Sequence, residues 1–190
     1  MIELKRETKE TNIDIVLEIN GSSQVQVSTG IGFFDHMLTS LSFWAGWNLK
    51  LSCIGDLEVD SHHTIEDTGL ALGKAFYKEW IEIKSIERIA HAFCPLDEAL
   101  TRVVVDICNR PYSTFSATFN VEKVGAFDTS MTGHFFRSFS QESRINLHIH
   151  NWYGDNAHHI IETIFKGVGL ALRKAVLPRH GFLMSTKGAL

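Results

Sequence analysis

The motif His-His-x-x-Glu occurs twice in the sequence, at residues 62–66 and 158–162. Side chains four residues apart lie on one face of a helix, so the first histidine and the glutamate of each copy can bind one metal ion. The second histidine of each copy, His63 or His159, points about 100° away from that face. It can instead reach the ion of the other copy, if the two helices meet within the fold or across a subunit boundary. The motif therefore predicts two metal ions with crossed ligands.

A further histidine precedes each copy at a similar distance. His36 lies 26 residues before His62, and His134 lies 24 residues before His158. The set then comprises six imidazoles and two carboxylates, enough for two sites of three histidines and one glutamate with positions open for a substrate. Such mixed ligation suits manganese, iron or zinc, and an open position is typical of a catalytic ion.

Three other classes of protein use similar residues in different patterns. In zinc proteases the order is His-Glu-x-x-His, with the glutamate between the ligands, so the present order does not indicate a protease. A di-metal phosphohydrolase normally has bridging carboxylates, whereas each site here has a single one. A non-enzymatic metal-binding protein of the ferritin-like type uses Glu-x-x-His on four facing helices. The last two classes remain the alternatives to the function described below.

Composition narrows the class of protein. The chain has 190 residues, of which 44% are hydrophobic and 21% charged, as expected of a globular protein. Its net charge of −4 argues against a nucleic-acid partner. No apolar run approaches the roughly 18 residues that would span a membrane, and no secretory signal is evident. Three cysteines without a CxxC pair fit a reducing cytoplasm.

The elements that position the histidines also repeat. Residues 70–75 (LALGKA) and 170–175 (LALRKA) follow the two motif copies, and each half predicts the order strand, strand, helix, strand, helix. The expected fold is α+β, with two duplicated halves packed as one unit, residues 1–93 and 94–190, the second ending in a C-terminal tail. The predicted strands cover 13–19, 25–27, 48–54, 101–108, 114–119 and 145–150, and the predicted helices cover 33–43, 62–80, 133–141 and 158–176.

These residues sit within longer matching stretches: 8–11, 32–38, 55–57, 60–67, 95–100, 110–112, 158–166 and 185–188. On them the chain resembles the imidazoleglycerol-phosphate dehydratase family over nearly its whole length. The resemblance implies a hydro-lyase of histidine biosynthesis that dehydrates imidazoleglycerol phosphate to imidazole acetol phosphate. It also implies two manganese ions per active site, which bind the substrate imidazole as imidazolate. The expected assembly is a cytoplasmic homo-oligomer, a 24-mer in this family, with sites at subunit contacts.

The resemblance also assigns roles to residues. It implies metal ligands at the same eight positions that the spacing proposes: His36, His62, His63, Glu66, His134, His158, His159 and Glu162. The helix-face argument groups His62, Glu66, His134 and His159 on one ion and the other four on the second. Implied substrate contacts are Glu10, Arg88, Arg110, Lys166, Ser185 and Lys187, whose basic members suit a phosphate. Candidates for proton transfer are Glu10, first, and then Glu66, Glu162 and Asp97. Trp44 stands where the family usually carries a phosphate-contacting histidine.

Overall fold

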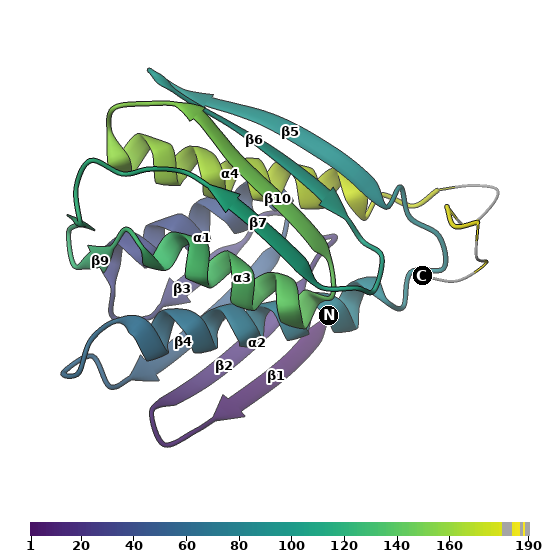
Figure 1. Cartoon of the computed structure of the whole chain (residues 1–190). Coiled ribbons are helices and arrows are strands. Elements are labelled where there is room, and N and C mark those ends of the chain that lie inside the picture. The colour runs from purple at the N-terminus through teal and green to yellow at the C-terminus, as the bar shows by residue number, and fades with distance from the viewer. Residues whose placement is uncertain (180–183, 187, 189–190) are drawn as a thin grey trace.

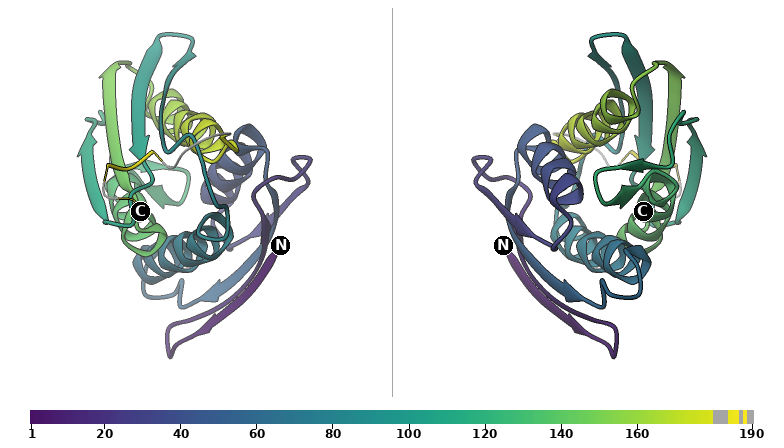
Figure 2. Two further views of the ribbon diagram at one scale, coloured as in Figure 1. Left: turned by 90° about the vertical axis from the view of Figure 1, so that its right-hand side faces the viewer. Right: turned by 90° about the vertical axis from the view of Figure 1, so that its left-hand side faces the viewer.

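The computed structural model describes residues 1–179, 184–186 and 188. Within them, two four-stranded sheets face each other across four helices (Figures 1 and 2). The first half runs β1 (Ile2–Glu7), β2 (Thr11–Glu18), β3 (Val25–Ser28), α1 (Gly32–Ala45), β4 (Asn48–Gly55) and α2 (His62–Trp80). The second half runs β5 (Ile89–Leu96), β6 (Ala99–Asp106), β7 (Tyr112–Ser116), β8 (Lys123–Val124), β9 (Phe127–Asp128), α3 (Met131–Ser143), β10 (Asn146–Tyr153) and α4 (Ala157–Ala175).

The two sheets have the same topology. Their strand orders are β1-β2-β4-β3 and β5-β6-β10-β7. In each sheet the first three strands pair antiparallel and the last pair, β3 with β4 or β7 with β10, is parallel. Alternation sets the buried face: Ile13, Ile15 and Leu17 of β2 point inward, as do Val103 and Val105 of β6. The predicted duplicated α+β fold is therefore confirmed.

Helices from different halves meet in the middle of the molecule. Helices α1 and α2 cover the inner face of the first sheet, whereas α3 and α4 cover the second, and the helical layers join through α1 with α4 and α2 with α3 (Figure 2). Small residues permit this approach. A Cβ atom at Gly73 would lie 2.5 Å from the Phe139 carbonyl oxygen, and one at Gly169 would lie 2.4 Å from that of Leu41. The ring of Phe135 fills the centre, stacked on Phe165.

Each half begins with a strand that the sequence pattern did not predict. In strand β1 Leu4 alone is buried, because β1 is an edge strand rich in charged residues. In β5 the large side chains Ile89 and Phe93 face outward and small residues face the core, so the usual apolar signal is inverted. All eight residues of β5 pair with β6, and the expected boundary between residues 93 and 94 falls inside this strand. The sheets divide the chain before residue 89.

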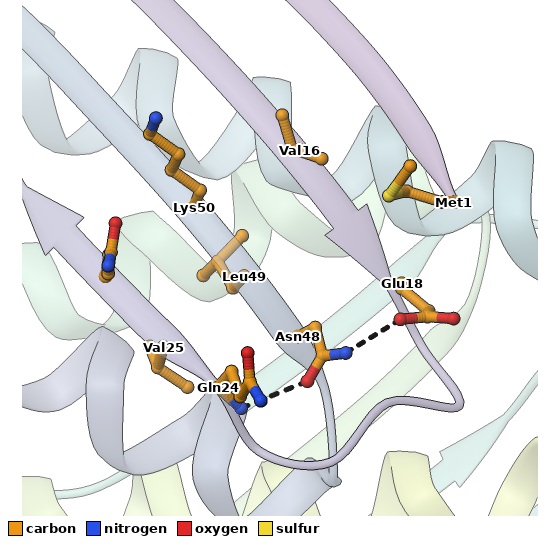
Figure 3. A pocket seen from close by; sticks show the side chains of 9 residues that line it. Met1, Val16, Glu18, Gln24, Val25, Asn48, Leu49 and Lys50 are labelled. Carbon is orange, nitrogen blue, oxygen red and sulfur yellow. Dashed lines mark hydrogen bonds between the residues drawn. The ribbon is translucent and has the colours of Figure 1, made fainter.

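A separate hollow lies on the outer side of the first sheet, at the end where β4 begins (Figure 3). Its volume is about 480 Å³. The Asn48 side chain bridges its edge, since its amide donates to Glu18 (2.7 Å) and its carbonyl oxygen accepts from the backbone N–H of Gln24 (3.0 Å). The candidate histidines follow the opposite end of the sheet, so this hollow is not part of their site. Among the described helices, none is both long and apolar enough to cross a membrane.

Candidate active site

The amino-terminal turns of the four helices bring the motif histidines to one end of the molecule, on the left of Figure 1. His62 opens α2 and His158 is the second residue of α4, while His36 and His134 lie in the first turns of α1 and α3. Because α2 packs on α3 and α4 on α1, each motif copy meets the preceding-helix histidine of the other half.

The first cluster is formed by His62, Glu66 and His134, here called the first triad. Glu66 Oε2 lies 3.1 Å from His62 Nε2 and 2.8 Å from His134 Nε2. The three potential ligand atoms are all within 4.8 Å of one another. A cavity of about 430 Å³ adjoins this triad and is lined by His62, Lys123 and Asp128, among others.

The second cluster is formed by His36, His158 and Glu162, here called the second triad. Glu162 Oε2 lies 3.1 Å from His158 Nε2 and 3.6 Å from His36 Nε2. The Lys166 ammonium contacts the other oxygen of Glu162 at 2.6 Å. Within the described residues these two triads are the groups whose geometry could hold a metal ion. They share no residue, which argues against the bridged carboxylate of a di-metal phosphohydrolase.

The structure thus brings together three members of each predicted ligand group and leaves the fourth apart. His63 Nδ1 lies 3.0 and 3.2 Å from the two oxygens of Asp56, and His159 Nδ1 lies 2.8 Å from Glu98. Neither imidazole belongs to a triad within the described part of the chain. Crossed ligation inside one chain is therefore not found. Ligation across a subunit boundary is the other arrangement that the sequence pattern allows.

Charge at the site favours a cation. Hydrogen bonds from His134 and His62 lower the pKa of Glu66, and they outweigh its partial burial. Burial acts to raise the pKa of Glu162, but the ion pair with Lys166 and the contacts with His36 and His158 together outweigh it, and the net shift is downward. The pKa of Glu98 falls to about 2 because its carboxylate accepts hydrogen bonds from His159 and from the backbone N–H of Asn156. All three carboxylates are ionised at neutral pH.

The donor set of each triad is two imidazole nitrogens and one carboxylate oxygen. This set fits a borderline divalent ion such as manganese, iron or zinc, because three ligands leave further coordination positions open. The Phe33 ring lies 5.0 Å from that of His158 and forms an apolar wall beside the second triad.

The predicted substrate residues lie in two separate regions. Lys166 is beside the second triad, with its Nζ atom 6.0 Å from the centre of the Trp44 ring. Glu10 Oε1 lies 3.8 Å from His63 Nε2. Arg88, in contrast, precedes β5 and pairs with Asp106, the last residue of β6, and with the Met184 carbonyl.

Arg110 follows β6 on the same side as Arg88. The eight residues of β5 span roughly 26 Å at about 3.3 Å per residue, and Glu98 beside His159 lies past the other end of this strand. Arg88 is therefore far from the motif histidines of its own chain. Ser185 is described in the C-terminal segment, and Lys187 lies outside the described residues.

The sequence pattern assigns no role to Asp56 or Glu98, although each contacts a motif histidine. Asp97, a proton-transfer candidate, occupies the β5–β6 turn with a φ of 45°, whereas its neighbour Glu98 makes the contact with His159. Asp56 and Glu98 were part of matching stretches, but only the folded chain shows that each accepts from a motif histidine. The duplication could have indicated Glu98, because Glu10 and Glu98 each directly precede the second strand of their sheet.

This arrangement has counterparts among solved structures. The imidazoleglycerol-phosphate dehydratase of Pyrococcus furiosus, in complex with (S)-C348, matches with a TM-score of 0.86 and 34% identity over 98% of this chain and 100% of that chain. The enzyme from Staphylococcus aureus subsp. aureus N315 matches with a TM-score of 0.82 and 36% identity over 94% of this chain and 100% of that chain. The fold and its site define an enzyme of the dehydratase class.

Sequence comparison identifies the family. The family model for imidazoleglycerol-phosphate dehydratase matches residues 29–172. The imidazoleglycerol-phosphate dehydratase of Oleidesulfovibrio alaskensis is 49% identical over 186 residues, which cover 97% of this chain and 95% of the relative. The chain belongs to the imidazoleglycerol-phosphate dehydratase family, and it is accordingly a carbon–oxygen hydro-lyase.

Proposed function

We propose that the chain dehydrates imidazoleglycerol phosphate to imidazole acetol phosphate, a step of histidine biosynthesis, with two manganese ions per active site. The pair of imidazole–carboxylate triads is the observation that carries this proposal. Each triad would hold one ion, and two ions would match the two nitrogens of the substrate ring. The phosphate of the substrate binds to the basic residues Lys166, Arg88 and Arg110, together with Ser185 and Lys187.

The active site lies at a contact between copies of the chain. Two features support this proposal. His63 and His159 belong to no triad of their own chain in the described residues, and their Nε2 atoms remain available to a neighbour. Arg88 is separated from the motif histidines by the length of β5, which exceeds the size of a small phosphate ester. A homo-oligomer, the 24-mer of the family, joins these separated groups.

The reaction breaks the C–O bond on the ring-attached carbon and a C–H bond on the next carbon. Water leaves, and the resulting enol becomes the ketone. Bound divalent ions supply Lewis acidity that favours loss of the ring proton. The remaining task for the protein is to hold the ring and the phosphate and to move the carbon-bound proton.

Glu10 is the best placed of the four proton-transfer candidates. Glu66 and Glu162 each accept hydrogen bonds within a triad, and Asp97 is held in a tight turn. The Glu10 side chain is 52% exposed, and its carboxylate Oε1 lies 3.8 Å from His63 Nε2. A ring bound next to His63 therefore lies next to a free carboxylate. A general base of this kind contributes a rate factor of ~10²–10⁴.

The test is an assay of ketone formation from imidazoleglycerol phosphate. Purified protein is stripped with a chelator and reloaded with Mn²⁺, and metal per chain is measured in parallel. We expect product only after reloading. Protein that holds the metal but forms no ketone would rule out the dehydration reaction.

The role of Glu10 is tested separately. The Glu10→Gln variant should keep its manganese and lose a factor of ~10²–10⁴ in kcat. Full activity in this variant would transfer the proton-transfer role to Glu66, Glu162 or Asp97.

A further inference from the structure

The geometry points to Asp56 and Glu98 as positioning residues that hold the rings of His63 and His159 with Nε2 turned outward, toward a second copy of the chain. This inference rests on the proposed function, because the outward Nε2 atoms are ligands only if metal sites form between copies. It also accounts for the free carboxylate of Glu10.

Glu98 is fixed from both sides. Its Oε1 atom accepts from the backbone N–H groups of Asp155 (3.1 Å) and Asn156 (2.8 Å), just before α4. Its Oε2 atom lies 2.8 Å from His159 Nδ1. An ionised carboxylate only accepts hydrogen bonds, so Nδ1 carries a proton, and in the neutral imidazole Nε2 then keeps its lone pair. A carboxylate behind a ligating imidazole commonly fixes the tautomer and ring orientation in this way.

Asp56 plays the same part for His63 from a different element. It directly follows β4, and both of its carboxylate oxygens lie within 3.2 Å of His63 Nδ1. Its backbone N–H donates to the Glu10 carbonyl oxygen at 3.1 Å. The Nε2 atom of His63 is therefore on the side of the ring that faces the Glu10 carboxylate.

The two duplicated halves use different residues to orient the second histidine of the motif. Glu10 and Glu98 hold equivalent places, because each precedes the second strand of its sheet and each contacts the aspartate after β4 or β10. In the second half the glutamate side chain orients the histidine. In the first half the longer loop from Asp56 to Ser61 lets Asp56 do so. Glu10 therefore does not orient His63, and its carboxylate lies next to His63 Nε2 instead.

Two measurements separate positioning from an ordinary surface ion pair, which contributes little. The first is the affinity for Mn²⁺ by calorimetry, together with metal per chain. We expect Glu98→Ala and Asp56→Ala each to weaken Mn²⁺ binding about 10–100-fold. Glu98→Gln should restore part of this loss, because its amide oxygen can still accept from His159.

The second measurement is the ¹⁵N NMR spectrum of the histidine rings in metal-free protein. In the wild type, His63 and His159 should show the tautomer with the proton on Nδ1. Each alanine variant should shift only its own ring toward a mixture of tautomers. The control is Asp14→Ala, which breaks the exposed pair with Lys5 and should change neither measurement.

The outcomes distinguish this inference from the proposed function. Wild-type protein that binds Mn²⁺ and makes ketone, with alanine variants that bind Mn²⁺ equally well and keep their tautomers, would overturn the positioning role alone. Wild-type protein that binds no Mn²⁺ would overturn both. Weaker metal binding with a changed tautomer, in a variant with an unchanged circular dichroism spectrum, supports the inference.

Discussion

The contact of α2 with α3 gives the sharpest prediction about the scaffold. In the Gly73→Ala variant the new Cβ would lie 2.5 Å from the Phe139 carbonyl oxygen, so the helices must separate by about 0.9 Å to reach the 3.4 Å of ordinary contact. Overpacking of this kind costs about 1–3 kcal/mol. The higher helix propensity of alanine returns about 0.8–1 kcal/mol. At the middle of these two ranges the net destabilisation is about 1 kcal/mol.

The assay is thermal unfolding of metal-free protein, followed by circular dichroism at a fixed protein concentration. For a chain of this size the melting temperature should then fall by about 2–4 °C. The control is Gly32→Ala, at the first position of α1, where no heavy atom lies within 4 Å of the added Cβ. This variant should melt at or slightly above the wild-type temperature.

The Gly73→Ala change should also alter the spacing of the ligands in the first triad, because α2 carries His62 and Glu66 while α3 carries His134. We expect Gly73→Ala to weaken Mn²⁺ binding at that triad, and Gly169→Ala to act on the second triad. A Gly73→Ala variant that melts like the control and binds Mn²⁺ normally would refute the close-packing argument.

Further outcomes follow from the site and the core. His63→Ala and His159→Ala should each lower metal per chain and activity together, and a variant that keeps both would exclude crossed ligands. Trp44→His should lower KM by adding a phosphate contact near Lys166, whereas an unchanged KM would mean that the existing basic groups suffice. Manganese at 100 times its Kd should stabilise the fold by about 2.7 kcal/mol, visible as a melting shift that a chelator reverses. Burial raises the pKa of the Cys94 thiol, so alkylation at pH 8 should be slow until the protein unfolds.

Much of the fold could be predicted because it repeats. The helices have apolar residues at helical spacing, and the motif spacing alone placed His62 with Glu66 and His158 with Glu162. The preceding histidines could be linked to these pairs, since both copies share the same order of elements. Edge strands β1 and β5 escaped prediction because one is charged and the other carries its large apolar residues outside.

Contacts between distant residues could not be read from the pattern. Glu98 reaches His159 only because the β5–β6 turn packs against the start of α4, and no periodicity encodes that contact. The same holds for Arg88, whose pairing with Asp106 depends on the register between β5 and β6. Local spacing thus identified the ligands, whereas the groups that orient them required the tertiary structure.

The exchange of one histidine between the halves has an evolutionary consequence. A single ancestral half with this fold would carry two triad members on its second helix and the third on its first, where they do not meet. It would complete a triad only by pairing with another copy of itself. Fusion of two such halves turned that encounter into a contact within one chain, with a high effective concentration. Within such a fused chain the two copies can differ, and here Glu10 and Glu98 have unlike surroundings.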